Sequence, residues 1–257
     1  MDHAVQEALS LVVITYNEEA NIARCLKSAQ EVVDEMLVVD SFSNDRTVEI
    51  AQSLGARVEQ RPFSGYIEQK RYAISQAKYN RVLVLDADEA LDPQLLKSVI
   101  VAKQNWSHDC HTMNRMSNLN DRWIRHGGWY PDKKMRLFDR RQYEVVGINP
   151  HDKFVPLTNA TQAHLQGDIL HYTNSSFEDR IQTINKFSTV AAQAFYEKGK
   201  RGTWLRVLCK PALRFLSEYL LRRGFLDGFY GFFIAKTSAQ YVFYREVKLL
   251  DLHKRKK

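Results

Sequence analysis

Three carboxylates within four positions mark the part of this chain whose residue types most clearly permit chemistry. Asp86, Asp88 and Glu89 directly follow the apolar run Val82–Leu85. The run predicts a strand buried on both faces, as in parallel sheets covered by helices. Because side chains alternate along a strand, Asp86 and Asp88 should point the same way, and two like charges held together favour a cation between them. Such oxygen ligands suit Mg²⁺ or Mn²⁺ with substrate phosphates, whereas a helix N-cap is the simpler alternative.

Two other predicted strands also end in polar residues. Thr15-Tyr16-Asn17-Glu18 follows the apolar run that begins at Leu9, and Asp40-Ser41-Phe42-Ser43 follows the run that begins at Met36. Ligands of open α/β sheets bind beyond the carboxyl ends of the strands. If these strands are neighbours of the one ending at Asp86, the three clusters converge on one crevice. Each cluster alone could instead be a helix cap or a solvated turn. Glu89, which alternates away from Asp86, is expected to serve the loop.

The first hundred residues alternate strand and helix patterns. Asn17 is a candidate cap for the first helix, Ser43 or Asn44 for the second, and Asp92-Pro93 for the last. This alternation predicts an α/β fold with a mostly parallel, doubly wound sheet and right-handed crossovers. Strands are expected at 9–15, 36–40, 57–59 and 81–86, and helices at 18–33, 44–54, 65–77 and 94–102.

The remainder of the chain is predicted to complete one catalytic domain and to add a helical extension. Short strand patterns such as Lys134–Phe138 continue to about residue 170, and a long helix is expected from Phe177 to about Lys198. We therefore assign residues 1–175 to the catalytic domain, with 1–105 as its donor half and 106–175 as its acceptor half. Residues 176–257 form the extension.

Charge is concentrated in that extension. Residues 198–257 hold 15 Lys and Arg against 4 Asp and Glu, within a net charge of +7 for the whole chain. Aromatic and aliphatic residues lie between the basic ones, a pattern typical of an amphipathic helix at a membrane surface. A helical subdomain with a basic wet face is the alternative. No run of about eighteen apolar residues predicts a membrane span.

Cysteine use and the N-terminus predict a cytosolic protein. The three cysteines are widely spaced and form no C-x-x-C pattern, which argues against a disulfide framework or a zinc site. Residues 1–10 have no basic segment of a signal peptide. Together with the basic extension, this predicts a cytoplasmic protein bound peripherally to the inner face of the cell membrane.

The polar strand ends resemble those of bacterial family 2 glycosyltransferases, which have the nucleotide-diphospho-sugar transferase (GT-A) fold. The similarity covers most of the chain and is greatest to the subgroup that adds β-glucose to the inner-core heptose of lipopolysaccharide. Phe42 departs from it, since the family commonly has a small residue there. The motifs that carry the resemblance are Val12–Glu19, Val38–Thr47, Leu85–Glu89, Gly128–Asp132, Arg136–Phe138 and Gly224–Gly228.

The resemblance implies an inverting sugar transfer from a UDP-sugar. Tyr16, Glu18 and Asp40 would contact uridine, and Asp86 would lie beside the ribose. Asp88 would bind Mg²⁺ or Mn²⁺ on the diphosphate, where the metal neutralises the departing UDP. The full nucleotide-sugar set is Thr15, Tyr16, Asn17, Glu18, Asp40 and Asp86.

The acceptor side is less sharply defined. Asp152 occupies the place of the family's catalytic base, although relatives more often have His-Glu where this chain has His151-Asp152; His151 and Asp132 are alternative bases. Trp129 and Tyr130 could stack on a sugar, and Arg136 could hold a phosphate. His171, which follows a predicted strand, is a candidate second metal ligand or a structural histidine. The expected acceptor site is Trp129, Tyr130 and Arg136, and the expected metal ligands are Asp88 and His171.

Parts of the sequence are also compatible with other functions. Transfer to polyprenyl phosphate or to another cell-envelope glycan is the close alternative to lipopolysaccharide core. A nucleotidyltransferase needs a Gly-rich basic loop after the first strand, but that loop is acidic here. A nucleic-acid binder would explain the basic extension but not the carboxylates at three strand ends. We therefore expect no nucleic-acid partner.

Overall fold

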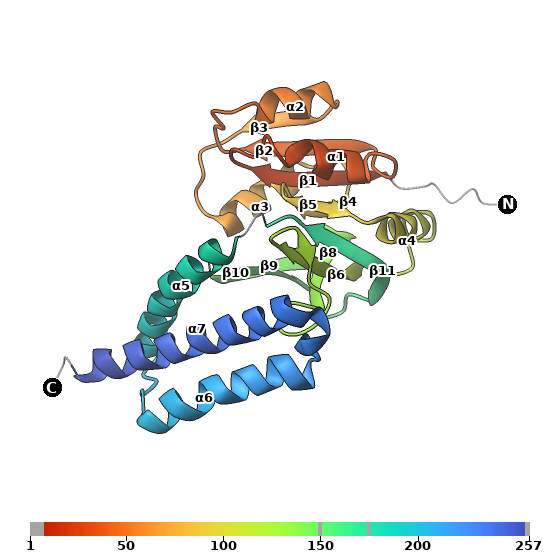
Figure 1. The fold of residues 1–257 in the computed structure, drawn as a ribbon. Coiled ribbons are helices and arrows are strands. Elements are labelled where there is room, and N and C mark those ends of the chain that lie inside the picture. Colours follow the sequence, from red (N-terminus) through yellow and green to blue (C-terminus); the bar gives the residue numbers. More distant parts are fainter. Residues whose placement is uncertain (1–7, 149–150, 174–175, 255–257) are drawn as a thin grey trace. The chain divides into compact units, whose positions relative to one another are not determined.

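Four parallel strands form the half of the main sheet that presents the polar strand ends. The computed structural model describes residues 8–148, 151–173 and 176–254, except for the side chains of residues 148, 151 and 152. The strands lie in the order β3-β2-β1-β4 (Figure 1), so the predicted neighbourhood of the three polar clusters is confirmed. Their bounds are β1 Leu9–Thr15, β2 Glu35–Asp40, β3 Arg57–Gln60 and β4 Arg81–Asp86.

Antiparallel strands extend this sheet beyond β4. The order continues as β8, β6, β11 and β5, and the short strand β5 was not predicted from the sequence. A separate hairpin is formed by β9 and β10. The bounds are β5 Glu89–Leu91, β6 Cys110–Leu119, β7 Arg122–Trp123, β8 Asp132–Asp139, β9 Tyr143–Ile148, β10 His151–Pro156 and β11 Gln162–His171.

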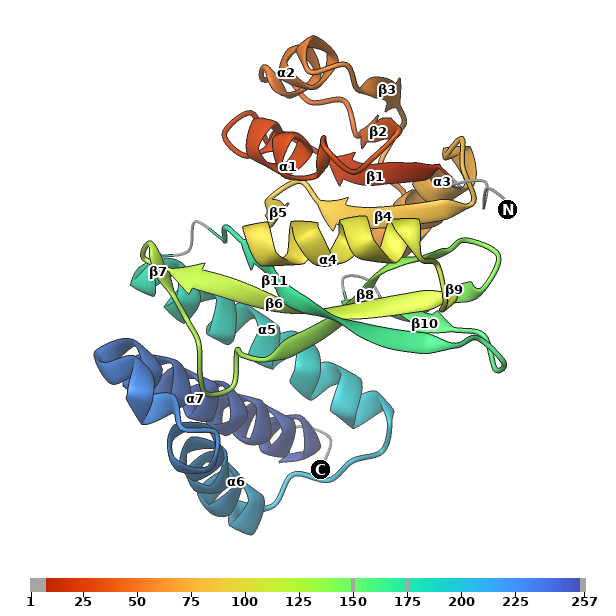
Figure 2. The same ribbon diagram turned by 90° about the vertical axis from the view of Figure 1, so that its right-hand side faces the viewer.

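Both faces of the parallel strands are buried, as the apolar runs predicted. Leu11 and Val13 of β1 face a core that includes α1, α2 and α4, whereas Val12 faces the other core with α3. Figure 2 shows α1 and α4 on one face of the sheet. The α/β fold class is thereby confirmed. The helices are α1 Ile22–Ala29, α2 Thr47–Ser53, α3 Tyr66–Gln76 and α4 Pro93–Gln104.

The predicted helix caps were right in one case and wrong in two. The Asp92 carboxylate accepts a hydrogen bond from the Leu95 N–H, as expected for a cap before a proline. The first two helices begin later than predicted, after Asn21 and Arg46, and neither of these residues makes a side-chain cap. The polar side chains before these helices are instead used between the two loops, as described below.

The chain divides into two compact units. Unit 1 comprises Met1–Arg115 and Asp132–Tyr172, and unit 2 comprises Met116–Pro131 and Thr173–Lys257. The sequence placed residues 116–131 with the catalytic domain, but this segment packs on the C-terminal helices. A Cβ on Gly128 would lie 2.2 Å from Glu218 Oε1, and Asp227 accepts hydrogen bonds from the N–H groups of Arg125 and His126.

In unit 2, α7 packs against both α5 and α6. The carboxylate of Glu246 on α7 is fully buried and pairs with Lys210 of α6 and with Arg245. Lys248 donates hydrogen bonds to Asn185 and to neighbouring groups of α5. None of the helices described is long and apolar enough to cross a membrane. The elements are α5 Phe177–Glu197, α6 Trp204–Leu216, a π-helical turn Ser217–Leu221, a 3₁₀ turn Gly224–Asp227 and α7 Gly228–Lys254.

Candidate active site

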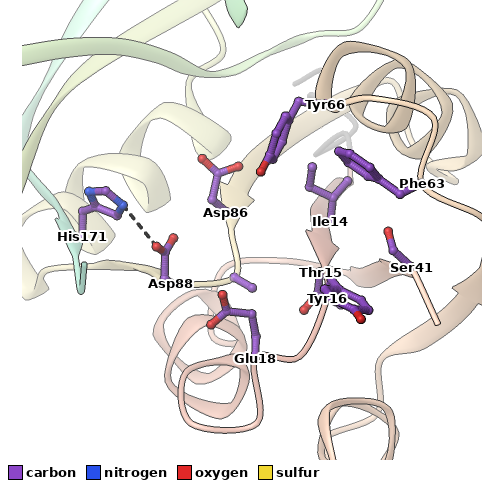
Figure 3. Close-up of a pocket in the computed structure, with 11 residues that line it drawn as sticks. Ile14, Thr15, Tyr16, Glu18, Ser41, Phe63, Tyr66, Asp86, Asp88 and His171 are labelled. Atoms are coloured by element: carbon purple, nitrogen blue, oxygen red, sulfur yellow. Dashed lines mark hydrogen bonds and ion pairs between the residues drawn. The ribbon is translucent and has the colours of Figure 1, made fainter. Parts of the chain in front are cut away.

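A cavity of about 620 Å³ lies at the carboxyl ends of β1, β2 and β4. This is the point where the strand order reverses, because β2 lies on one side of β1 and β4 on the other. Ligands of open α/β sheets bind at such points, and the volume is typical of small-molecule sites. Figure 3 shows the lining side chains, which are Ile14, Thr15, Tyr16, Glu18, Ser41, Phe63, Tyr66, Asp86, Ala87, Asp88 and His171.

Most of the predicted donor-site residues share this cavity. Those among its lining are Thr15, Tyr16, Glu18, Asp86, Asp88 and His171. The side chain of Tyr16 is largely exposed, which leaves its ring available to a ligand. Asn17 and Asp40 do not line the cavity, and their predicted contacts with a nucleotide stay predictions.

Asn17 and Asp40 instead shape the two loops that border the cavity. The Asn17 side-chain oxygen accepts a hydrogen bond from the Asn44 N–H, and the Asn17 N–H donates to Ser43 Oγ. The buried Asp40 carboxylate accepts from both the N–H and the hydroxyl of Ser43. Phe42 has a φ of 62°, a conformation that is costly for a residue with a side chain. These bonds therefore hold a strained turn beside the cavity.

Asp88 and His171 meet although they lie 83 positions apart. Strand β5 pairs with β11 so that His171 is opposite Glu89, and the Tyr172 N–H donates to the Asp88 carbonyl. His171 Nε2 then lies 3.2 Å from Asp88 Oδ2. The dashed line in Figure 3 marks this contact. The pairing of the two predicted metal ligands thus depends on a strand that the sequence did not reveal.

Glu18 faces the same part of the cavity from the β1 loop (Figure 3). Burial raises the pKa of its carboxyl, the hydrogen bond from Asn21 opposes this, and the charge of Asp88 adds to the rise. A bound cation would relieve this repulsion between carboxylates. No three His, Cys, Asp or Glu side chains among the described residues are grouped closely enough to hold a metal alone. Asp88 and His171 nevertheless fit a metal that takes its remaining ligands from a substrate diphosphate.

Asp86 is held ionised by two cations. Its Oδ1 lies 3.0 Å from Lys70 Nζ, and its Oδ2 lies 2.8 Å from Arg136 Nη2. Burial alone would raise the pKa of Asp86, but the charges of Arg136 and Lys70 outweigh it and hold this pKa far below its usual value. Arg136, which the sequence placed in the acceptor site, is itself buried in this network. Its acceptor role stays a prediction.

Glu89 completes the network. Its carboxylate accepts a hydrogen bond from the Asp86 N–H, although the sequence predicted that Glu89 alternates away from Asp86 and serves the loop. It also pairs with Arg136 at 2.8 Å and with Arg115 at 3.3 Å while being almost fully buried. The sequence did not predict these ion pairs, because the arginines come from β6 and β8, which are distant along the chain.

The remaining predicted residues lie outside the cavity lining. Trp129 and Tyr130 belong to unit 2, where Trp129 packs against a cluster that contains Ile124 and lies under the Arg180 guanidinium. Asp152 is in β10 and pairs with Gly147, but its side chain is outside the described part of the chain. The acceptor and base roles of these residues stay predictions.

Some residues of the site were missed by the sequence interpretation. Phe63 and Tyr66 form an edge-to-face aromatic pair, with ring centroids 5.0 Å apart, on the wall of the cavity. The glycine between them, Gly65, has a φ of 127° just before α3. Aromatic residues around a glycine at a helix start were a usable signal. The burial of Lys70 on α3 left no comparable trace in the sequence.

Comparison with known proteins identifies the relatives of this chain. Residues 10–157 match the family described as Glycosyl transferase family 2. An uncharacterized glycosyltransferase of Rickettsia bellii is 30% identical, over 98% of this chain and 89% of its own length. The lipopolysaccharide core biosynthesis glycosyltransferase LpsC of Rhizobium meliloti is 28% identical, over 95% of this chain and 93% of its own.

Similarity to solved structures is weaker. The crystal structure of TarS from S. aureus aligns with 72% of this chain and 39% of its own at 18% identity and a TM-score of 0.47. A similarity of this strength says nothing about ligands.

The buried ion network predicts a large effect of Arg136→Met. The substitution leaves Asp86 and Glu89 short of a buried partner and should lower the free energy of unfolding by about 3–5 kcal/mol at pH 7. The depressed pKa of Asp86 contributes stability that is present above the unfolded value of about 4 and is lost as pH falls through and below it. The difference between variant and wild type should therefore shrink on acidification, as measured by urea unfolding at several pH values.

Arg46→Met is the matched control, because Arg46 and its partner Glu49 are both largely exposed. Its cost should be much smaller, because an exposed ion pair contributes little to stability. Equal losses of unfolding free energy in the two variants would show that burial of the ion network adds no stability beyond that of an exposed pair.

Proposed function

Because the chain belongs to glycosyl transferase family 2, we propose that it moves glucose from UDP-glucose to the inner-core heptose of lipopolysaccharide. Glycosyl transfer follows from the family, and the GT-A fold accords with the sheet and its flanking helices. The donor and the acceptor are the proposed parts. One observation carries the donor assignment, namely the cavity at the strand-order reversal that unites Glu18, Asp86 and Asp88 with aromatic side chains.

The chemistry of the cavity suits a nucleoside diphosphate-sugar. Exposed aromatic rings such as Tyr16 and Phe63 can stack on a base, and carboxylates accept hydrogen bonds from ribose hydroxyls or a ring N–H. Asp88 and His171 would hold Mg²⁺ or Mn²⁺ on the diphosphate. When bound, the metal neutralises the charge that develops on the leaving UDP.

The proposed reaction inverts the anomeric carbon. The acceptor hydroxyl forms the new C–O bond, the bond from the sugar to the diphosphate breaks, and its electron pair leaves with UDP. Asp152 takes the hydroxyl proton. Asp132 is the alternative base, but its carboxylate already pairs with Arg115 and Lys134. These two ion pairs make Asp152 the preferred candidate.

The acceptor assignment is supported by relatedness. LpsC, a full-length relative, is named for lipopolysaccharide core biosynthesis. Polyprenyl phosphate or another envelope glycan is the alternative acceptor, and either lipid-linked acceptor would require work at a membrane face. We place the protein in the cytoplasm, bound peripherally to the membrane.

An exposed apolar face on α6 supports membrane binding. Half of the helix circumference carries no charge and is open to solvent, with Leu205 71% and Leu208 67% exposed. Basic residues such as Arg201 and Arg222 lie exposed at the two ends of this face. Such a face fits the boundary of an anionic bilayer. The residues of this α6 apolar face are Trp204, Leu205, Leu208, Cys209, Ala212, Leu213 and Leu216.

The donor assignment predicts that Asp88→Asn abolishes transfer. Loss of the metal ligand should reduce turnover at least ~100-fold, since the metal contributes several kcal/mol to the transition state. UDP release from UDP-glucose is measured with lipopolysaccharide core or polyprenyl phosphate as acceptor, with Mg²⁺, Mn²⁺ or a chelator. Glu31→Gln, an exposed site on the loop after α1, is the control.

Two results would contradict this assignment. Full activity of Asp88→Asn, or activity that a chelator leaves unchanged, would refute the metal role. Equal turnover with polyprenyl phosphate alone would refute the lipopolysaccharide acceptor while leaving the donor assignment intact.

The base assignment predicts different losses for Asp152→Asn and Asp132→Asn. Removal of the base should lower kcat by roughly 10²–10⁴-fold while UDP binding is retained. Asp132→Asn should lose much less. The comparison is made by steady-state kinetics together with calorimetric titration of UDP, and the opposite ranking would transfer the base role to Asp132.

The α6 apolar face predicts vesicle binding that depends on leucine. The double variant Leu208→Glu and Leu213→Glu should reduce partitioning onto anionic phospholipid vesicles at least ~10-fold, because each leucine loses a buried contact worth about 1.5–3 kcal/mol. Val101→Glu, at an exposed valine of α4, should bind like wild type. Flotation of the double variant at the wild-type level would show that the face has another role.

A further inference from the structure

A second cavity of unit 1 lies next to the candidate donor site. Its volume is about 410 Å³, and it shares Tyr66 and Asp86 with the first cavity. Strands β4, β6, β8 and β10 and helix α3 contribute its walls. The lining is Tyr66, Lys70, Asp86, Arg115, Asp132, Lys133, Lys134, Met135, Arg136, Lys153 and Phe154. We call it the cationic pocket.

Positive charge dominates this pocket. Six of its lining residues are basic and two are acidic, Asp86 and Asp132. Both carboxylates are already paired, Asp86 with Lys70 and Arg136, and Asp132 with Arg115 and Lys134. Their charges therefore cancel only part of the positive potential.

The positive potential of the pocket affects the pKa of Lys134, which lies inside it. Burial lowers the pKa of Lys134, and the charges of Arg115 and Arg136 lower it further, against the opposing effect of Asp132. In the part of the chain that the structure describes, Lys133 and Lys153 have no acidic partner, and both are exposed at the mouth. An anion that enters would meet two such lysines and a partly neutralised cluster beneath them.

We propose that the cationic pocket binds a phosphate or carboxylate group of the acceptor saccharide. The inference rests on the proposed function, since it adds the chemical class of the acceptor to it. The donor diphosphate is less suited to this place, because the donor cavity has its own carboxylates and His171 for a metal-bound diphosphate. The shared wall at Asp86 would put an anionic acceptor next to the transferred sugar.

Direct anion binding tests the proposal. Inorganic phosphate and acetate are titrated into the full-length protein, with and without saturating UDP, and binding is followed by calorimetry and by ³¹P line broadening for phosphate. The variants are Lys133→Glu and Lys153→Glu. Lys97→Glu, with an exposed side chain on α4, carries the same charge change away from the pocket.

We expect saturable binding of at least one of the two anions that UDP does not displace. Each pocket variant should weaken it about tenfold, because a hydrogen bond to a charged group contributes on the order of 1.5 kcal/mol. Lys97→Glu should bind like wild type. In the transfer assay, the pocket variants should raise the KM for acceptor and leave the KM for UDP-glucose unchanged.

Three results would overturn the proposal. These are absence of saturable anion binding, displacement of the anion by UDP, and equal weakening by Lys97→Glu. Binding is measured without any acceptor lipid. A failure to glucosylate lipopolysaccharide core would therefore count against the proposed function and not against an anion site.

Discussion

The ionised carboxylate of Asp86, held between Lys70 and Arg136, is the interaction on which the site depends. Removing two charges from water is costly, and only close opposite charges with good geometry offset that cost. The network meets this requirement by drawing Lys70 from α3, Arg136 from β8 and Glu89 from β5 onto the end of β4. One ionic cluster therefore joins the parallel and antiparallel parts of unit 1. Asp86 itself lies in the lining of both the candidate active-site cavity and the cationic pocket.

A second constraint acts at the opposite wall, where the loops after β1 and β2 are bonded to each other. The Glu18 N–H donates to Thr47 Oγ1, and the Glu19 N–H donates to an Asp45 carboxylate oxygen. Asn17 and Ser43, which the sequence predicted to cap the following helices, form hydrogen bonds between the loops instead. Helices α1 and α2 therefore begin later than the sequence predicted. These hydrogen bonds connect the two loops that carry Tyr16 and Ser41 into the lining of the cavity.

In unit 2, the packing of the helices depends on a buried charge and on small residues. Glycine at position 231 lets the backbone of α7 approach the Gly224 carbonyl, where a Cβ would lie at 1.8 Å. Glu246 gathers basic side chains of α6 and α7 on the inner side. Because Lys210 of α6 turns toward Glu246, the opposite half of α6 is apolar and exposed. Such an amphipathic arrangement suits a lipid surface.

The sequence by itself determined the elements whose signal is local. Buried apolar runs predicted β1, β2 and β4, the Asp92-Pro93 pair predicted the start of α4, and polar strand ends predicted most of the residues that line the cavity beyond these strands. Tertiary structure alone decided which charges meet. Strand β5 is too short for a pattern, yet its pairing with β11 brings His171 to Asp88. The carboxylates of Asp86, Asp88 and Glu89 could be recognised from the sequence because they adjoin one strand. Their partners could not, because ion pairing depends on distances across a sheet, and a sequence records only distances along the chain.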